Sequence, residues 1–353
     1  MNFRLLKHLA IFSFLSCSGL YAQETCLESL SRAEDEFDIG RLYQVPEKLK
    51  DCLESGFTRE EKVRAYRLLT LSYLYLNYFE KADTSFLELL KLSPLYLANK
   101  DVDPSEILNH EIKFTTRPNL LLTFKVGPNL SRPWVIQEYS VSGTGSQKNY
   151  SSITGMQFGG GADFYLAPRI YLNAEVFFTR AAFQVTDYQW DFYRTQLNQV
   201  RVTAQLPVSI KYLLAGRKFV PYVQAGLVPE MLINSSTEKI QGTFLNVEEN
   251  QQPISPRAQI GNRSKRTPFN YSLMAGAGVQ MRVGINYLVA EARYQVGMLN
   301  VVDKSARFLT ESEADRSLLF FPSAFVDDDH RMSNLMFNFG FIRPLYKPRK
   351  LIF

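Results

Sequence analysis

The chain has 353 residues and a formal net charge of +5 at pH 7, from 40 Lys and Arg against 35 Asp and Glu. This length allows two modest domains and a sizeable core. The basic residues are spread over the whole chain rather than gathered on one segment, so the sequence lacks the electrostatic footprint of a nucleic-acid-binding protein. We therefore expect no nucleic-acid partner.

The N-terminus has the pattern of a secretory signal peptide. Arg4 and Lys7 precede an apolar run that ends at Leu20, and a cleavage site follows at Ala22. Residues 1–22 are therefore predicted to be removed on export, the alternative being a lipoprotein site at Cys17. The run is too short for a spanning helix, and no later stretch offers about 18 uninterrupted apolar residues. We expect the mature chain in the periplasm, in the outer membrane or outside the cell.

Two cysteines remain after removal of the signal peptide, Cys26 and Cys52. In an oxidising compartment such a pair favours a disulfide. A metal site is the weaker hypothesis, because His110 and His330 lie far from both cysteines in the sequence.

Residues 23–98 have the spacing of helices, with apolar residues three and four apart and few glycines. Two helical hairpins can be drawn. The second resembles the tetratricopeptide signature in the order and spacing of its packing residues, which are Tyr66, Leu69, Tyr73, Ala82, Phe86 and Pro94. In that pattern Ala82 lets the two helices approach, Tyr73 and Phe86 fill the angle between them, and Pro94 stops the second helix. A packed helical cap and a protein-docking module both fit this domain.

A linker with one short helix is predicted over residues 99–117. Asp103 is the expected N-cap of that helix, and Pro104 the expected first-turn proline. We expect this segment to set the spacing between the helical domain and the membrane.

From Pro118 onward apolar and polar residues alternate, which is the period of a β-strand. The longest example runs from Gln199 to Leu214 and carries no charge on its apolar parity. That matches a strand crossing lipid, which needs about 9–11 tilted residues, although a soluble antiparallel sheet is the alternative. Residues 118–353 contain eight such strands, over 119–127, 154–166, 170–179, 199–214, 221–228, 271–282, 288–296 and 334–341.

Connection lengths orient the predicted barrel. The connections after the second, fourth and sixth strands are tight turns, whereas those after the first, third, fifth and seventh are long and polar. Membrane barrels have short periplasmic turns and long external loops. We therefore predict an eight-stranded antiparallel outer-membrane β-barrel, preceded by a small periplasmic α-helical domain, with the C-terminus also in the periplasm.

The inward parity of these strands carries charges of both signs. An eight-stranded barrel is just wide enough to be filled by side chains, so we expect a plugged lumen rather than an open pore. An ion-pair network is the main hypothesis and a proton or ion relay the alternative. The predicted interior charges are Lys125, Asp163, Glu175, Arg201, Lys211, Arg282, Glu291 and Arg293.

Pro207 points inward from the middle of the longest strand and cannot donate a ladder hydrogen bond. The prediction is a β-bulge or a locally opened ladder at this position. An unbroken register through Pro207 would contradict it.

A catalytic or cation-binding role is hardest to exclude at His330, which follows Asp327, Asp328 and Asp329. A lipid-modifying enzyme could use the histidine, and a cation could bind the carboxylates, but the spacing matches no loop motif. The pattern is more typical of a solvated loop. We expect no catalytic residues, no cofactor, no metal and no small-molecule substrate.

The loop before the sixth strand is basic and includes Arg257, Arg263, Lys265 and Arg266. These side chains could meet lipid phosphates at the outer surface. A merely solvated loop is equally compatible with the sequence.

One strand pair resembles a known family. LPVSIKY over 206–212, followed across a short turn by PYVQAG over 221–226, is similar to the LP and PY-G strand pair of the outer-membrane β-barrel family that includes the type IX secretion factor PorT. The resemblance covers Pro118 to the C-terminus and implies eight strands, no catalytic residues and a place in protein export or gliding machinery. The helical domain departs from the family's barrel-only pattern.

These observations lead to one expected function. We expect a non-enzymatic outer-membrane barrel that is a subunit or assembly factor of an envelope machine, for protein export or outer-membrane biogenesis, and that docks other envelope proteins through its helical domain. Outer-membrane lipid is the other expected partner. A lipid-modifying barrel enzyme and a surface-exposed adhesion or binding barrel are the alternatives.

Overall fold

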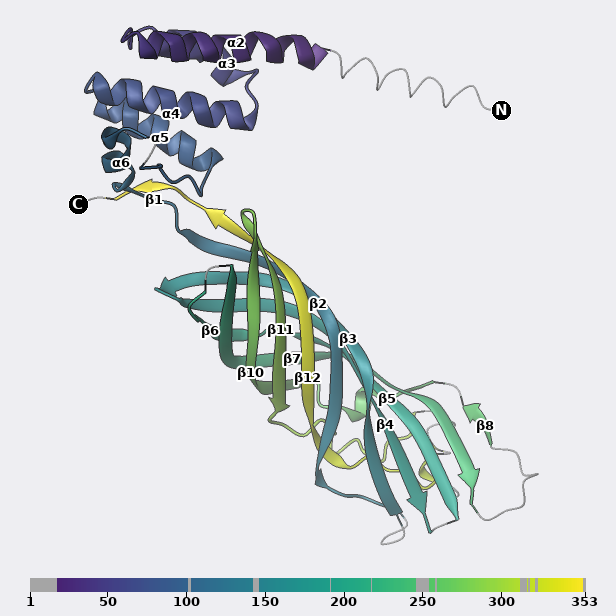
Figure 1. Cartoon of the computed structure of the whole chain (residues 1–353). Helices are drawn as coiled ribbons and strands as arrows, with labels where there is room; N and C mark the ends of the chain where they lie inside the picture. The colour runs from purple at the N-terminus through teal and green to yellow at the C-terminus, as the bar shows by residue number, and fades with distance from the viewer. Residues whose placement is uncertain are drawn as a thin grey trace, which may run out of the picture. The chain divides into compact units, whose positions relative to one another are not determined.

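The structure is a computed structural model that describes residues 18–100, 103–141, 146–190, 192–216, 218–245, 254–257, 259–311, 316, 318–320 and 323–351 (Figure 1). Most of the predicted signal peptide, including Cys17, lies outside these residues. The chain divides into two compact units, one of residues 1–119 with 346–353 and the other of residues 120–345. The predicted fold class, a small helical region followed by an eight-stranded antiparallel barrel, is confirmed.

The helical unit contains α2 (Ser18–Asp38), α3 (Val45–Glu54), α4 (Arg59–Tyr75), α5 (Phe79–Leu92) and α6 (Ser105–Glu111). Helix α4 begins with a capping box, in which the Thr58 hydroxyl accepts the Glu61 N–H and the Glu61 carboxylate accepts the Thr58 N–H. Helix α5 ends two residues before Pro94, as expected of a residue that cannot continue a helix. None of the described helices is both long and apolar enough to span a membrane.

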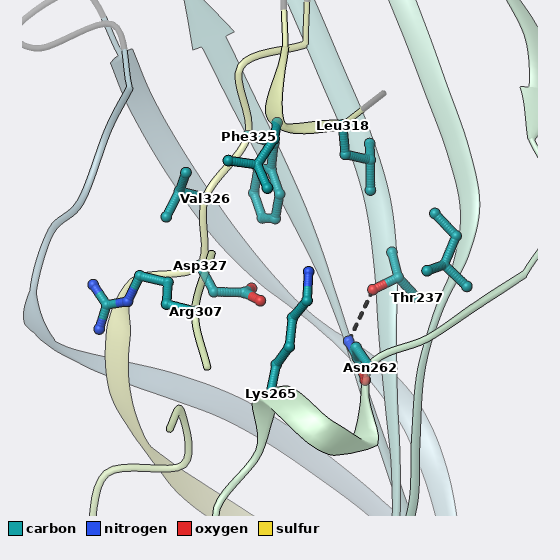
Figure 2. A pocket seen from close by; sticks show the side chains of 10 residues that line it. Thr237, Asn262, Lys265, Arg307, Leu318, Phe325, Val326 and Asp327 are labelled. Carbon is teal, nitrogen blue, oxygen red and sulfur yellow. Dashed lines mark hydrogen bonds between the residues drawn. The ribbon is translucent and has the colours of Figure 1, made fainter. Parts of the chain in front are cut away.

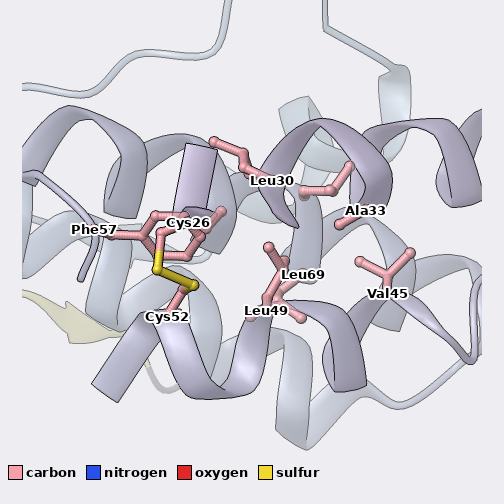
Figure 3. Close-up of a cluster of buried hydrophobic side chains, with 10 residues drawn as sticks. Cys26, Leu30, Ala33, Val45, Leu49, Cys52, Phe57 and Leu69 are labelled. Atoms are coloured by element: carbon pink, nitrogen blue, oxygen red, sulfur yellow. A yellow bond between two sulfur atoms is a disulfide. The ribbon is translucent and has the colours of Figure 1, made fainter. Parts of the chain in front are cut away.

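The predicted disulfide joins α2 to α3 (Figure 3), with Cα atoms of Cys26 and Cys52 5.6 Å apart. It closes a loop with a sequence separation of 26, so the chain-entropy model assigns it about 3.5 kcal/mol. Around it lies an apolar cluster to which α2, α3 and α4 all contribute, including Leu30, Leu49 and Leu69. A small helical unit with a limited core gains most from such a cross-link.

The predicted packing residues of the second hairpin fall into two clusters. Ala82 and Phe86 are fully buried, and Phe86 lies in a second apolar cluster with Leu71 and Ile107. Tyr66 packs against both clusters, whereas Tyr73 packs only against the cluster of the disulfide. Tyr73 and Phe86 therefore do not share one contact region as the repeat pattern suggested.

The segment predicted as a linker contributes Ile107 and Phe114 to the second cluster. Asp103 does not cap α6, because its carboxylate accepts hydrogen bonds from Arg67 and from the Asn99 N–H instead. The N-cap prediction was therefore wrong. Arg67 lies far from Asp103 in the sequence, and such a tertiary partner is invisible to a local capping rule.

The last residues of the chain belong to the helical unit. Strand β1 (Phe114–Thr115) pairs with β13 (Arg349–Lys350) in an antiparallel ladder. The Lys350 ammonium contacts the Asp83 carboxylate of α5, and the Leu351 N–H donates to the Lys113 carbonyl at 2.7 Å. The chain thus passes between the two units twice.

The barrel is a closed ring of antiparallel strands. Its members in ring order are β2 (Pro118–Gln137), β3 (Ser146–Ala167), β4 (Ile170–Gln189), β5 (Tyr193–Gln205) continued by β6 (Val208–Leu213), β7 (Phe219–Phe244), β10 (Phe269–Val283), β11 (Asn286–Gly297) and β12 (Asp329–Tyr346), which returns to β2. Successive residues alternate between buried and exposed along each of them. The exposed parity carries apolar side chains, among them Phe124, Phe158, Val208, Leu227, Leu273 and Phe339. This apolar belt is what lipid requires of an outer wall.

The strands next to the first, third and fifth connections are longer than predicted. Strand β3 has 22 residues and β7 has 26, against 15 in β10 and 12 in β11. In Figure 1, β2 to β5 run on well beyond β10 and β11. The expected long loop after the third strand was wrong, because β4 and β5 continue to a short turn after Gln189. Outside lipid, the outward side chains of a strand can be polar, so the alternation of apolar and polar residues that marks the belt disappears.

The register runs unbroken past Pro207. Gln205 pairs with Phe177 and Val208 with Ala174, three residues on in both strands, and the same holds against Glu230 and Leu227 of β7. The predicted bulge was wrong. The Pro207 carbonyl accepts the Glu175 N–H at 3.0 Å, so only the bond that proline cannot donate is missing, and the strand is interrupted there without a change of register.

We call the end with the β3–β4, β6–β7 and β10–β11 turns the turn end and the opposite one the loop end. At the loop end, the connections carry β8 (Ile254–Arg257), β9 (Ile260–Gly261) and the 3-10 helix η2 (Arg263–Lys265). Apolar side chains of β9 and of the connection between β11 and β12 pack with the strand extensions into one cluster that includes Phe183, Leu197, Ile240, Val301 and Phe325. The loop end is therefore a folded cap with its own core.

Candidate functional site

The centre of the lumen holds a cluster of four charged side chains. Lys125 Nζ lies 2.7 Å from Glu175 Oε1 and 3.1 Å from Glu291 Oε2. Arg293 bridges the same two carboxylates, with its Nε 2.7 Å from Glu291 Oε1. These side chains come from β2, β4 and β11, and inward parity brings them together. Each cation meets two anions, so no charge in the cluster is left uncompensated.

A second ion pair lies beside this cluster. Lys211 Nζ is 2.6 Å from Asp163 Oδ2, and the Asn173 amide donates to the other Asp163 oxygen at 2.5 Å. Tyr222 connects the two groups, since its hydroxyl donates to Glu291 at 2.5 Å while its ring lies 4.9 Å from Lys211 Nζ. The network as a whole contains three cations and three carboxylates, all buried.

Arg201 and Arg282 lie apart from the network. Arg201 is buried nearer the loop end, 3.9 Å from Glu230. Arg282 is exposed, because it lies two residues beyond Gln280, the last buried residue of β10. Its Nε donates to the Gly284 carbonyl in the turn. It has the inward parity but not the depth, so its prediction as an interior charge was wrong.

Apolar side chains close the lumen on both sides of the network. At the turn end, Leu121, Val289 and Ile342 form a buried layer with the Tyr222 ring. At the loop end lies the core of the cap. A paired, charge-balanced layer between two apolar layers fills the interior, as an eight-stranded barrel requires.

Each carboxylate of the Asp327–Asp329 run has its own cation. Asp327 pairs with Arg266 at 2.9 Å, Asp328 with Lys148 at 2.6 Å, and Asp329 with Arg307. Tyr150 also donates to Asp328, at 2.6 Å. Lys148 comes from β3, Arg266 from the connection between β7 and β10, and Arg307 from the connection between β11 and β12, so the run fastens three separate segments of the cap together. Its interpretation as a solvated loop was wrong.

His330 follows this run of aspartates and is buried, with 1% of its surface exposed. Its Nδ1 lies 2.8 Å from the Asp328 carbonyl oxygen, and its ring packs edge-on to Phe183. Burial lowers the pKa of the imidazole to about 4, so the ring is neutral at pH 7 and its Nδ1–H donates to that carbonyl.

Two basic side chains of the loop before β10 are buried in the same cap. Lys265 and Arg266 are buried, and Arg266 also donates to Gln199 at 2.8 Å. Arg263 is exposed, and the Arg257 side chain lies outside the described residues. Lys265 and Arg266 are therefore not available to lipid phosphates.

A small cavity lies inside the cap (Figure 2). Lys265, Arg307 and Asp327 face it from separate segments, and the Asn262 amide donates to the Thr237 hydroxyl at 3.0 Å on its wall. The cavity has a volume of about 30 Å³, the space of roughly one water molecule. Within the part of the chain that the structure describes, no group of three or more His, Cys, Asp or Glu side chains is arranged to hold a metal ion.

Residues 111–303 match the family model described as the outer membrane protein beta-barrel domain. The chain belongs to this family. Its structure is similar to the outer membrane protein OprG from Pseudomonas aeruginosa, at 11% identity over 67% of this chain and 98% of that one, with a TM-score of 0.33. It is also similar to the outer membrane protease OmpT from Escherichia coli, at 8% identity over 66% and 98%, with a TM-score of 0.38. A comparison with curated proteins found no match.

Membership of this family assigns the chain to the outer membrane and its apolar belt to the lipid. Several residues of this outer-membrane barrel escaped the sequence analysis. Glu230, the partner of Arg201, keeps the inward parity of β7 but lies just past the predicted strand end at residue 228. A prediction that extended this strand by two residues would have included it. Lys148 and Arg307 lie in segments without any periodic signal, and no rule of spacing connects them to the aspartates.

Two buried groups in the cap of the outer-membrane barrel have pKa values that are shifted in opposite directions. Burial raises the pKa of the Asp187 carboxyl from 3.8 to about 6, so its contribution to stability is present at low pH and is lost as pH rises through about 6. The His330 contribution is present above its unfolded pKa of 6.5 and is lost as pH falls towards about 4. Each amounts to on the order of 3 kcal/mol, and the two oppose each other as the pH falls.

We therefore expect these two contributions to cap stability to act in opposite directions between pH 7 and 4.5 in the parent protein. Asp187→Asn should make the cap lose protection on acidification, and His330→Gln should make it gain protection. Hydrogen exchange of the cap amides measures both slopes, with the amides of the β10–β11 turn as the internal control. If both variants kept the parent's pH profile, these two groups would not govern the cap.

Proposed function

We propose that this chain is a non-enzymatic outer-membrane barrel that holds its helical unit in the periplasm and is a subunit or assembly factor of an envelope machine, in protein export or outer-membrane biogenesis. One observation carries the proposal. The helical unit has an aromatic patch, which we define as Tyr43, Tyr75, Tyr78 and Phe79.

The patch is exposed although its side chains are large and apolar. Tyr43 has 68% of its surface exposed and Phe79 has 55%. The rings of Tyr43 and Tyr78 lie 6.5 Å apart, and the Lys81 ammonium lies 5.2 Å from the Tyr78 ring. Exposed aromatic clusters next to a cation are typical of protein interfaces, where Tyr and Phe bury much area at little entropic cost.

Other observations support a docking role over an enzymatic one. The lumen is filled by paired charges, and His330 is buried as a neutral ring with Nδ1 donating to a backbone carbonyl. The resemblance of the second hairpin to the tetratricopeptide signature suits protein docking, since such repeats expose binding faces. The strand pair that resembles the PorT-containing family favours a machine for protein export.

Two arguments support the proposal that the turn end faces the periplasm. Short turns of membrane barrels face the periplasm, and the turns after β3, β6 and β10 are short. A disulfide in the helical unit suits the same oxidising compartment.

Photo-crosslinking in cells tests the docking role. A photoreactive phenylalanine at Tyr43 and, separately, at Phe79 is expected to give the same discrete adduct with one envelope protein. The control position is Leu97, which is 80% exposed but follows the far end of α5. Absence of adducts at both patch positions, or identical adducts at Leu97, would contradict the proposal.

A second variant distinguishes docking from folding. Tyr43→Ser combined with Phe79→Ser should abolish the adduct formed from a probe at Tyr78 while the barrel still migrates as a folded band in unheated gels. If the adduct survived this double substitution, the patch would not be the docking surface.

A further inference from the structure

Two arginines mark the loop-end edge of the apolar belt where β2 meets β12. Along β2 the outward residues are apolar up to Leu130, and Arg132 and Trp134 follow. Along β12 they are apolar down to Leu335, and Ser333 and Arg331 follow. The Ser333 hydroxyl donates to the Arg132 carbonyl at 2.9 Å, which places these two residues side by side. Antiparallel strands then bring Arg331 to the level of Trp134.

Two adjoining hollows open at this point. One of about 190 Å³ is lined by Trp134, Val296, Met332 and Arg331, and most of its lining is apolar. The other, of about 570 Å³, is more polar and is lined by Arg132, Tyr294 and Ser333, and also by Lys148 and Tyr150 of the cap. Both share Trp134 and Ser333. Together they form one amphipathic groove, which we call the seam groove.

The two arginines have no anionic partner within the described residues. The outward arginine of β4, Arg180, differs in this respect, since its guanidinium lies 3.9 Å from Glu238. A guanidinium at a membrane interface is suited to a phosphate, which it can bind through two parallel N–H donors. Trp134, 65% exposed, has the amphipathic ring typical of that interface.

We propose that the seam groove binds one phosphorylated membrane lipid, with its phosphate held by Arg132 and Arg331 and one acyl chain lying in the apolar hollow against Trp134 and Val296. The occupant is a lipid rather than a protein because the groove continues the lipid-facing belt. It is a lipid rather than a free phosphate because the apolar hollow adjoins the cationic edge. This inference does not depend on the docking role of the helical unit.

Native mass spectrometry of the full chain in a non-ionic detergent tests the proposal. The matched probes are dioleoyl phosphatidic acid and dioleoylglycerol, which differ only in the phosphate. We expect one bound phosphatidic acid at an affinity at least tenfold above that of dioleoylglycerol. Arg132→Met combined with Arg331→Met should remove this preference, and Arg180→Met should leave it unchanged.

The remaining arms separate a lipid site from an anion site and from a folding defect. Inorganic phosphate at the same concentration should not displace the lipid. Arg132→Lys combined with Arg331→Lys keeps the charge and should retain part of the preference. Equal binding of the two probes, displacement by inorganic phosphate, or a double methionine variant that folds and still prefers phosphatidic acid would each overturn the proposal.

Discussion

Replacing Lys211 with methionine is expected to lower the free energy of unfolding of the barrel by about 3–5 kcal/mol. The ammonium lies 2.6 Å from Asp163 inside the lumen, and both side chains are almost fully buried. Its removal leaves a carboxylate without a counter-charge in a region from which water is excluded, which costs far more than the ion pair itself contributes. Urea unfolding from lipid vesicles measures the difference.

Two further variants make this result specific. Adding Asp163→Leu to Lys211→Met should recover most of the lost stability, because removing both partners leaves no unpaired charge. Arg282→Met, which removes an exposed cation of the same parity, should change stability by less than about 0.5 kcal/mol. If Lys211→Met cost as little as Arg282→Met, the lumen would be open to water.

Val208→Lys is expected to lower the free energy of unfolding by about 2–4 kcal/mol, because it places an ammonium in the middle of the lipid-facing wall. Val208 is 45% exposed on the outer face. Leu214→Lys lies on the same face six residues along the same path, next to the β6–β7 turn, and should cost only about 0–1 kcal/mol. Both values come from the same unfolding experiment in vesicles.

The comparison also distinguishes a membrane barrel from a water-soluble one. In water, both positions would be solvated and the two lysines would cost about the same small amount. Equal costs at Val208 and Leu214 would therefore contradict a lipid-facing wall. A gradient that follows the distance from the turn end would support it.

The sequence predicts the belt of the barrel well because lipid imposes one rule on every strand. Where the outward parity must be apolar, as from Phe124 to Leu130, alternation is visible and the strands are found. Beyond the belt, β4 carries Gln184 and Thr186 on its partly exposed side, and the rule no longer applies. The strand extensions and the hairpin of β4 and β5 were missed for this reason.

The alternation of the strands predicted which charged side chains have the inward parity, but neither their depth in the barrel nor their partners. Parity alone places Lys125, Glu175 and Glu291 inside, yet which of them meet across the lumen depends on the stagger of the strands, which alternation does not encode. Arg282 shows the converse limit, since parity without depth gave a wrong assignment. The pairing of the three aspartates was missed because their cations come from three segments that are distant in the sequence, and a local run of acids is ambiguous without them.

The ladder of β1 with β13 makes the first unit of the chain wait for its last residues. Helices α2 to α6 precede the barrel in the chain, whereas Lys350 and Leu351, which contact Asp83 and the Lys113 carbonyl, follow all eight barrel strands. Every barrel strand is therefore synthesised and exported before the N-terminal unit can reach its final form. A chain cut after the barrel would lack the β13 partner of β1, so the helical unit could not form this ladder.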